Sequence, residues 1–392
     1  MAQRKLTRLI VRTALIVFVC VLCLEFLMIV TDPYLFKDRF EYDPDIGFRA
    51  RARFPNGLGQ HGRGDDGTLT NQFGFNDRDY ASQKAPGTFR IVVVGDSFGW
   101  AGGREDNYTA VLERMFENRD GAHKVDVINT GYPGTHTGEQ LGMLKKFGLQ
   151  YNPDLVILGF FAGNDFFDAD PNRKRIVLNE YFFDIDKRYE HRFLGYPIVA
   201  QSRLWLFLKN KFEVAASGRV AKREAEEWAA QTGQPTPLRN LPAETYYNVQ
   251  RAKLEFFNQK TSAERFGSHT KNIFEAIEEM NELLKSRGTK FMVAIYPDEF
   301  QVNPIQFDSL VEKFHLQKAD YDLNLAQNLL KTFLESKQIP YLDMLDRFRE
   351  EEKQRELYMF RNTHWNDAGN ELAAQILYQY LSKQLYDSNL AK

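Results

Sequence analysis

Five apolar runs along the chain have the pattern of buried parallel strands. They cover residues 91–94, 125–129, 155–161, 290–296 and 339–343. A parallel strand is covered on both faces, so it reads as a nearly continuous aliphatic run rather than a strict alternation. Residues 271–287 carry apolar side chains at helical spacing and end before Gly288, which predicts a helix. Alternating strands and helices predict an α/β fold, a three-layer α/β/α sandwich around a mostly parallel sheet.

A different apolar pattern occupies the start of the chain. Residues 13–30 form an apolar run of eighteen residues interrupted only by Glu25, which is long enough to cross a bilayer. We expect a transmembrane anchor preceded by a basic tail, residues 1–12, that stays in the cytoplasm because positive charge favours that side. The large domain is then extracytoplasmic, or periplasmic in a bacterium. A cleaved signal peptide is the alternative, although no small-residue cleavage site follows the run.

Two further segments lie outside the regular strand and helix pattern. Residues 31–89 are rich in Gly, Asp, Asn and Arg, and we interpret them as a small β-rich collar or linker. The main domain then covers residues 90–385, with a helical insertion at about 168–265. Apolar clusters at 181–183 and 204–208 indicate either an added helical layer, a lid, or a patch resting on the membrane.

Composition restricts the classes of function. The chain is 43% hydrophobic and 27% charged, as in globular proteins, and its net charge is −2. The first twelve residues hold four basic side chains, so the remainder carries −6, which argues against nucleic acid as a partner. Both cysteines, Cys20 and Cys23, fall inside the apolar run. The exported domain therefore has no disulfide and no cysteine-based zinc or redox site, and we expect no cofactor or metal.

Polar or glycine residues stand at the ends of four predicted segments. Ser97 follows the strand at 91–94 within a Gly-Asp-Ser turn, and Gly131 follows the strand at 125–129. Asn164 follows the strand at 155–161, and His364 precedes the last helix. Loops at the carboxyl ends of parallel strands are where α/β folds place their chemistry. Each residue also has a structural interpretation, since Gly131 suits a turn, Asn164 a helix cap, and His364 a surface loop.

This order of Ser, Gly, Asn and His resembles the four sequence blocks of the SGNH or GDSL hydrolase family. The resemblance covers roughly residues 86–385 without the insertion, and the family's fold is the three-layer sandwich expected above. It implies that Ser97 is the nucleophile and His364 the general base of an acyl transfer. It also implies an oxyanion hole built from the Ser97 N–H, the Gly131 N–H and the Asn164 side chain.

One position departs from the family pattern. The acid that orients the histidine usually stands two or three residues before it, where this chain has Asn362 and Arg361. An asparagine carbonyl can fix the imidazole tautomer but cannot neutralise an imidazolium. Asp343, at the end of a predicted strand, and Asp367, shortly after the histidine, are alternative partners. For Asp367 the structural interpretation is a helix N-cap.

The sequence therefore predicts a membrane-tethered, extracytoplasmic serine esterase of the SGNH type that acts through an acyl-enzyme. Its expected substrates are esters or acylated glycans. An O-acetyltransferase or deacetylase of cell-surface polysaccharide is an alternative, since sugar or water can accept the acyl group from the same serine. An inactive SGNH domain that binds glycan or envelope partners is another, motivated by Asn362.

Overall fold

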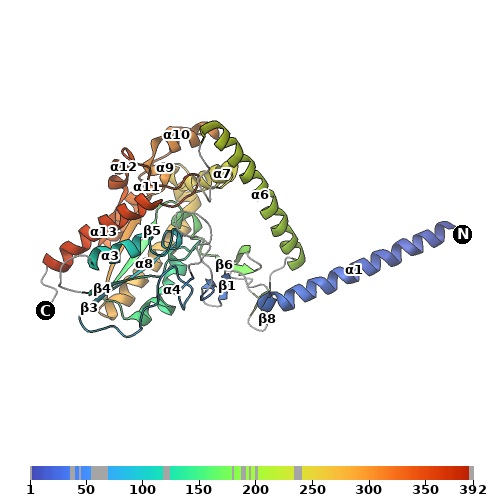
Figure 1. The fold of residues 1–392 in the computed structure, drawn as a ribbon, viewed down its shortest axis with the longest axis horizontal. Coiled ribbons are helices and arrows are strands. Elements are labelled where there is room, and N and C mark those ends of the chain that lie inside the picture. Colours follow the sequence, from blue (N-terminus) through green and yellow to red (C-terminus); the bar gives the residue numbers. More distant parts are fainter. Residues whose placement is uncertain are drawn as a thin grey trace. The chain divides into compact units, whose positions relative to one another are not determined.

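The computed structural model describes residues 2–35, 40–43, 46–53, 69–117, 124–178, 181–186, 191–193, 196–198, 202–233 and 241–387. Contacts divide the chain into two units. The larger unit combines Ala50–Pro171 with Glu224–Lys392, and the smaller combines Met1–Arg49 with Asn172–Arg223. Figure 1 follows the chain through both.

A five-stranded sheet forms the centre of the larger unit. All neighbouring strands are parallel, in the order β11-β10-β5-β3-β4. Numbered along the chain this is 2-1-3-4-5, the flavodoxin-like order, which leaves a crevice at the carboxyl ends of β3 and β5. The predicted three-layer fold is confirmed. The strands are β3 (Thr88–Gly95), β4 (Lys124–Asn129), β5 (Leu155–Phe161), β10 (Lys290–Tyr296) and β11 (Tyr341–Asp343).

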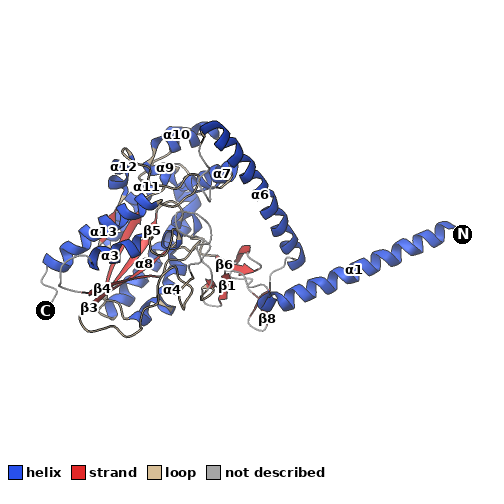
Figure 2. Ribbon diagram, in the orientation of Figure 1, coloured by secondary structure: helices blue, strands red, loops and turns tan. Residues whose placement is uncertain are grey.

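Helices cover both faces of this sheet (Figure 2). Successive strand residues point to opposite faces, so Val92 and Val94 join one core and Ile91 and Val93 the other. The first core is closed by α4 (Thr137–Lys146), α8 (Ser262–Ser286), α10 (Pro304–Lys313) and α11 (Leu325–Ser336). The second is closed by α3 (Tyr108–Glu117), α12 (Leu345–Glu352) and α13 (Asp367–Asp387).

Short helices stand at the carboxyl ends of three strands. These are α2 (Ser97–Trp100) after β3, α5 (Asp165–Asp168) after β5 and α9 (Glu299–Val302) after β10. The larger unit also contains α7 (Ala243–Leu254) and three 3₁₀ turns at Gly148–Tyr151, Glu255–Phe257 and Lys318–Asp320.

The smaller unit consists of two long helices and short hairpins. Within α1 (Ala2–Leu35), residues Arg4–Thr31 are long and apolar enough to cross a membrane or to serve as a signal sequence. The helix α6 (Arg203–Thr232) begins in this unit and ends in the larger one. The strands pair two by two: β1 (Phe40–Asp43) with β2 (Gly47–Ala50), β6 (Arg173–Leu178) with β7 (Tyr181–Asp186), and β8 (His191–Phe193) with β9 (Tyr196–Ile198).

These outer segments combine strands, helices and turns. The insertion, expected to be helical, opens with the hairpins β6–β9, because β-branched residues such as Ile176 and Val177 favour strands. In the expected collar, residues 71–76 form turns, since Asn71 Oδ1 accepts hydrogen bonds from the amides of Phe73 and Phe75, each at 3.0 Å.

Candidate active site

Ser97 stands where the central strand β3 turns into the short helix α2. The carboxylate of Asp96 accepts a hydrogen bond from the Phe98 amide at 3.0 Å, so Asp96 caps this helix. Ser97 is the first helical residue, a position whose N–H has no acceptor within the helix. Its side chain is half-buried at the carboxyl edge of the sheet. Ser97 therefore lies just beyond the carboxyl end of β3, where the crevice between β3 and β5 opens.

Asn129, the last residue of β4, holds this turn in place. Its fully buried side chain donates to the carbonyl of Gly99 at 2.6 Å and accepts from the Gly131 amide at 2.8 Å. The segment before β3 adds support, because Asn76 donates to the Trp100 carbonyl at 3.0 Å. Sequence reasoning missed Asn129, although an asparagine that ends a buried apolar strand is a visible signal.

Gly131 lies beside the turn that carries Ser97, close to Gly99. The Gly131 N–H donates to Asn129 Oδ1 and is therefore engaged within the protein. A Cβ atom at Gly131 would approach the Cα atom of Gly99 to 2.6 Å. In this structure the glycine allows the close approach of two backbone segments.

Asn164 follows β5, on the other side of the crevice. Its Nδ2 donates to Asp168 Oδ2 at 3.1 Å, and its Oδ1 is buried. The side chain makes no hydrogen bond that caps α5, although it occupies the N-cap position. The Asn164 Nδ2 donor therefore lies at the carboxyl edge of the sheet and is hydrogen-bonded to the carboxylate of Asp168, one helical turn later.

His364 lies in the loop before α13, and Asn362 orients its ring. The distance between His364 Nδ1 and Asn362 Oδ1 is 2.7 Å. An amide oxygen only accepts hydrogen bonds, so Nδ1 carries the proton and Nε2 holds a lone pair. Nε2 is fully buried and has no hydrogen-bond partner among the described residues. It is therefore not hydrogen-bonded to the Ser97 hydroxyl. The ring centroid lies 5.3 Å from that of Phe98, the residue next to Ser97.

Of the two alternative acids, Asp343 is bonded elsewhere and Asp367 lies at the start of the last helix. Asp343 accepts hydrogen bonds from Lys331 Nζ and from the Leu345 amide, each at 3.1 Å. Asp367 is exposed at the first position of α13, while the carbonyl oxygen of the Asn366 side chain accepts the Gly369 amide at 3.0 Å and caps the helix. The hydrogen bond of His364 Nδ1 is made to Asn362 Oδ1.

A buried lysine sets the electrostatics around this histidine. Lys253, near the end of α7, pairs with the buried Asp298 at 2.9 Å and lies 4.7 Å from the ring centroid of Phe161. Burial, and secondly the charge of Lys253, lower the pKa of His364 to about 3. Burial also raises the pKa of Asp96 to about 7, which Lys253 partly counteracts. Sequence reasoning missed Lys253, because nothing in its surroundings along the chain distinguishes it from a surface lysine.

Asp298 ties the lysine to the segment that carries Asn164. Its other carboxylate oxygen accepts from Gln250 Nε2 at 3.1 Å. A Cβ atom at Gly163 would meet Asp298 Oδ2 at 2.2 Å. Only glycine therefore allows this carboxylate to approach the turn that precedes Asn164.

Residues near the carboxyl end of α6 contact the loop that carries His364. Arg361 has a left-handed backbone with φ of 46°, and its guanidinium pairs with Glu224 at 2.6 Å. The ring of Trp228 packs on Phe360, with centroids 4.8 Å apart. These contacts fix the backbone on the side of the loop that leads into Asn362.

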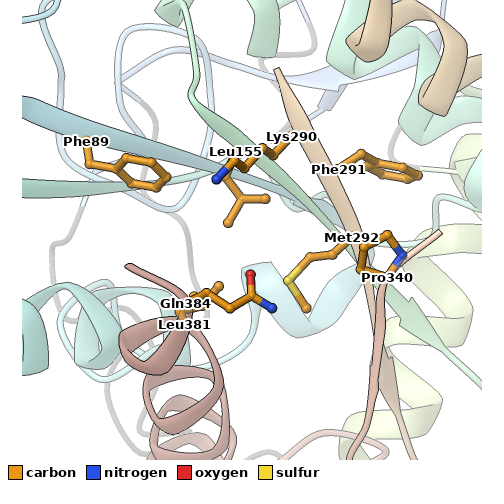
Figure 3. A pocket seen from close by; sticks show the side chains of 8 residues that line it. All are labelled: Phe89, Leu155, Lys290, Phe291, Met292, Pro340, Leu381 and Gln384. Atoms are coloured by element: carbon orange, nitrogen blue, oxygen red, sulfur yellow. The ribbon is translucent and has the colours of Figure 1, made fainter. Parts of the chain in front are cut away.

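Two cavities of the larger unit lie away from these residues. Figure 3 shows one of about 250 Å³ at the amino ends of β5 and β10, where Leu155, Met292 and Leu381 line it. A wider hollow of about 910 Å³ is lined by residues of α9, α10 and α12. Neither includes Ser97 or His364 in its lining. No group of three or more His, Cys, Asp or Glu side chains within the described ranges is arranged to hold a metal ion.

One family model matches the carboxyl-terminal part of the chain. Residues 256–392 match the family model described as the SGNH hydrolase-like domain of acetyltransferase AlgX. The matched segment contains His364 and Asn362, but it begins after Ser97, Gly131 and Asn164. No curated protein sequence matches the chain.

Solved structures of esterases and acylhydrolases are similar to most of the chain. The acetyl xylan esterase AlAXEase is 12% identical over 75% of this chain and 100% of its own, with a TM-score of 0.39. The lipase/acylhydrolase from Enterococcus faecalis is 14% identical over 76% of this chain and 96% of its own, with a TM-score of 0.37. Esterase EstA from Pseudoalteromonas sp. is 11% identical over 76% of this chain and 98% of its own, with a TM-score of 0.34. Over residues 256–392, the chain is similar to an SGNH hydrolase-like domain.

Proposed function

We propose that the protein is a membrane-tethered, extracytoplasmic serine esterase that acts through an acyl-enzyme on Ser97. The observation that carries this proposal is the contact of His364 Nδ1 with Asn362, which leaves Nε2 as a base beside the nucleophile turn. A serine hydroxyl is a weak nucleophile until such a base accepts its proton.

The reaction follows from the chemistry of these groups. Ser97 Oγ attacks the ester carbonyl carbon while its proton passes to His364 Nε2, and the carbonyl oxygen becomes an oxyanion. The Ser97 N–H and Asn164 Nδ2 are the donors we assign to that oxygen, with Asn164 exchanging Asp168 for the substrate. The imidazolium then gives its proton to the leaving alcohol as the carbon–oxygen bond breaks. Water, activated by His364, attacks the acyl-serine and releases the acid.

The charges around His364 limit the rate of this reaction. Asn362 is neutral and Lys253 is cationic, so neither stabilises the imidazolium that forms in the first step. Replacing the aspartate of a serine-protease triad by asparagine costs about 10⁴ in kcat. We therefore expect slow hydrolysis, driven mainly by the oxyanion donors and by substrate binding.

A second candidate is transfer of an acetyl group to a cell-surface polysaccharide. It is supported by the family model, whose description names an acetyltransferase. The same acyl-serine serves both reactions, because a sugar hydroxyl can replace water as the acceptor. An inactive domain that binds glycan or envelope partners is the remaining alternative, and it rests on Asn362 alone.

We infer the location from the first helix. Its basic residues Arg4, Lys5, Arg8 and Arg12 precede the apolar stretch and favour the cytoplasmic side. The unit that carries Ser97 then lies outside the cytoplasm, where esters of the cell envelope are accessible.

Hydrolysis of p-nitrophenyl acetate by the purified full chain tests the proposal. Ser97→Ala should abolish turnover, whereas Ser286→Ala, at an exposed serine of α8, should not change it. Asn164→Ala should slow kcat by about 10²–10³ through the loss of one oxyanion donor. Adding oligosaccharide acceptors and searching for acetylated products by mass spectrometry separates transfer from hydrolysis. Turnover by Ser97→Ala equal to that of the wild type would refute the nucleophile.

A further inference from the structure

Glu25, the single acidic residue of the apolar run in α1, accepts hydrogen bonds from the start of α6. Glu25 Oε1 accepts from the Arg203 amide at 2.5 Å, and Glu25 Oε2 accepts from Ser202 Oγ at 2.6 Å and from the Leu204 amide at 3.0 Å. The amino end of α6 therefore lies against the carboxyl-terminal part of α1 (Figure 1). A carboxylate at this position satisfies amides that a helix leaves without acceptors, and it complements the positive end of the helix dipole.

The first turns of α6 expose large apolar side chains on one face. Trp205, Leu208 and Phe212 are 62%, 41% and 71% exposed. Their spacing of three and four residues places them on the same side of the helix. Leu206, by contrast, is buried. The exposed face is thus a separate apolar surface, named here the α6 apolar face.

Glu25 fixes the depth of this face relative to the apolar stretch. That stretch ends at Thr31, six residues after Glu25, or about 9 Å along a helix axis. Ser202 and Leu204 bond directly to Glu25, so α6 begins at the same level. The exposed apolar residues of α1, from Leu6 to Val30, surround that level. The α6 apolar face therefore starts at a level that lies within the apolar stretch of a candidate membrane helix.

We propose that the α6 apolar face is a second membrane contact, inserted in the boundary of the extracytoplasmic leaflet beside α1. This inference rests on the proposed anchorage of α1. Tryptophan suits this boundary because its ring is apolar and its N–H is polar, and an apolar helix face gains free energy when acyl chains replace water. A lone carboxylate in a membrane helix is costly, so such groups find partners. The three donors from α6 provide them.

The same contact argues that α1 stays attached to the protein. Cleavage of α1 as a signal peptide would remove the acceptor of Ser202, Arg203 and Leu204 together. The first turn of a 30-residue helix would lose its carboxylate partner. A retained anchor is the arrangement in which both helices have their polar groups satisfied.

A polarity-sensitive dye at single cysteines in the full chain tests this proposal. Cys20 and Cys23 are first replaced by alanine, and a new cysteine at position 205 or 212 carries the dye. The protein is reconstituted in phosphatidylcholine vesicles with and without nitroxide-labelled lipids. Position 16 in α1 reports anchorage, and position 305, where Ile305 is 76% exposed in the larger unit, is the matched control.

We expect lipid nitroxides to quench the dye at 205 and 212 at least twofold more than at 305. Quenching at 16 without quenching at 205 and 212 would overturn the second contact and leave the anchor intact, whereas no quenching at 16 would refute the anchor itself. A dye at 205 that is shielded from water yet not quenched by lipids would contradict the proposal in favour of a protein partner. Glu25→Leu should at least halve the quenching at 205 without changing it at 16, and unchanged quenching at 205 would refute the role of Glu25.

Discussion

Asn362 determines how well His364 can act as a base. Its amide oxygen orients the ring at 2.7 Å, but it brings no charge to stabilise the imidazolium. We predict that Asn362→Asp raises the pKa of His364 and increases the kcat of ester hydrolysis at least tenfold, which corresponds to about 1.4 kcal/mol of barrier. Steady-state kinetics of the variant measure this directly.

The control for that substitution is Asp343→Ala. Asp343 is already bonded to Lys331 and Leu345, so its loss should leave kcat within about twofold of the wild type, a change of roughly 0.4 kcal/mol. If Asn362→Asp has no effect and Asp343→Ala is damaging, Asn362 is not the partner that matters.

Together with burial, the charge of Lys253 affects the pH dependence that we expect from His364. A base with a pKa of about 3 remains neutral at pH 5, whereas only about 3% of an ordinary imidazole would. We predict that kcat/KM of the wild type stays near its plateau down to pH 5. Lys253→Met should raise the pKa of His364 and move the acid limb to higher pH, and Lys253→Arg should leave it in place.

Stability must be monitored in the same pH range. The folded pKa of His364 lies below its unfolded value, so the stability that it contributes is present above pH 6.5 and is lost as the pH falls towards 3. Asp96 acts in the opposite direction, since its folded pKa is raised and the fold gains stability as the pH falls below about 7. An acid limb near pH 6.5 in folded wild-type protein would contradict the lowered pKa of His364, which burial and then Lys253 cause.

Among the elements, the turn from β3 to α2 depends on a residue of the next strand. Asn129→Ala removes buried hydrogen bonds to Gly99, Gly131 and Asn76, and we predict a loss of about 3 kcal/mol in unfolding free energy together with most of the activity. Chemical denaturation and ester hydrolysis measure the two effects.

Asn303→Ala is the matched control for that change. Asn303 caps α10 by accepting from the Ile305 and Gln306 amides, so its loss should cost about 1 kcal/mol and leave kcat unaltered. Equal effects of the two substitutions on activity would show that Asn129 acts only through global stability.

The central elements could be predicted from sequence because their patterns are local. The runs at 155–161 and 290–296 coincide with β5 and β10, since a buried parallel strand is written as a continuous apolar segment. The hairpins β6–β9 were not expected, because runs of three to six residues are too short to show a period. Lys253 and Asn129 were missed for another reason, which is that their partners Asp298 and Gly99 are distant in sequence.

At the scale of the whole molecule, a segment from the middle of the chain packs with the amino-terminal segment. Residues 172–223 join 1–49 in one unit, and β6 lies against β1. The sequence pattern suggested a collar over 31–89, but residues from Ala50 onward group with the larger unit, where Asn76 supports the nucleophile turn. Such pairings are non-local, so no window of sequence contains both partners.

The apolar stretch of the first helix leads to a prediction about cell fractionation. We expect the full chain to fractionate with membranes and to resist carbonate extraction, while protease added from outside digests the large unit. Immunodetection of both ends of the chain after fractionation measures this. Recovery of the protein mainly as a shorter soluble form would show that α1 is cleaved.

Covalent labelling of the active serine tests the central claim most directly. A fluorescent phosphonate reacts only with a serine that a neighbouring base activates. We predict one label per folded wild-type chain, mapped by mass spectrometry to the peptide that contains Ser97, and no label in Ser97→Ala or His364→Ala. A folded wild-type protein that takes no label, or a label that persists in Ser97→Ala, would contradict it.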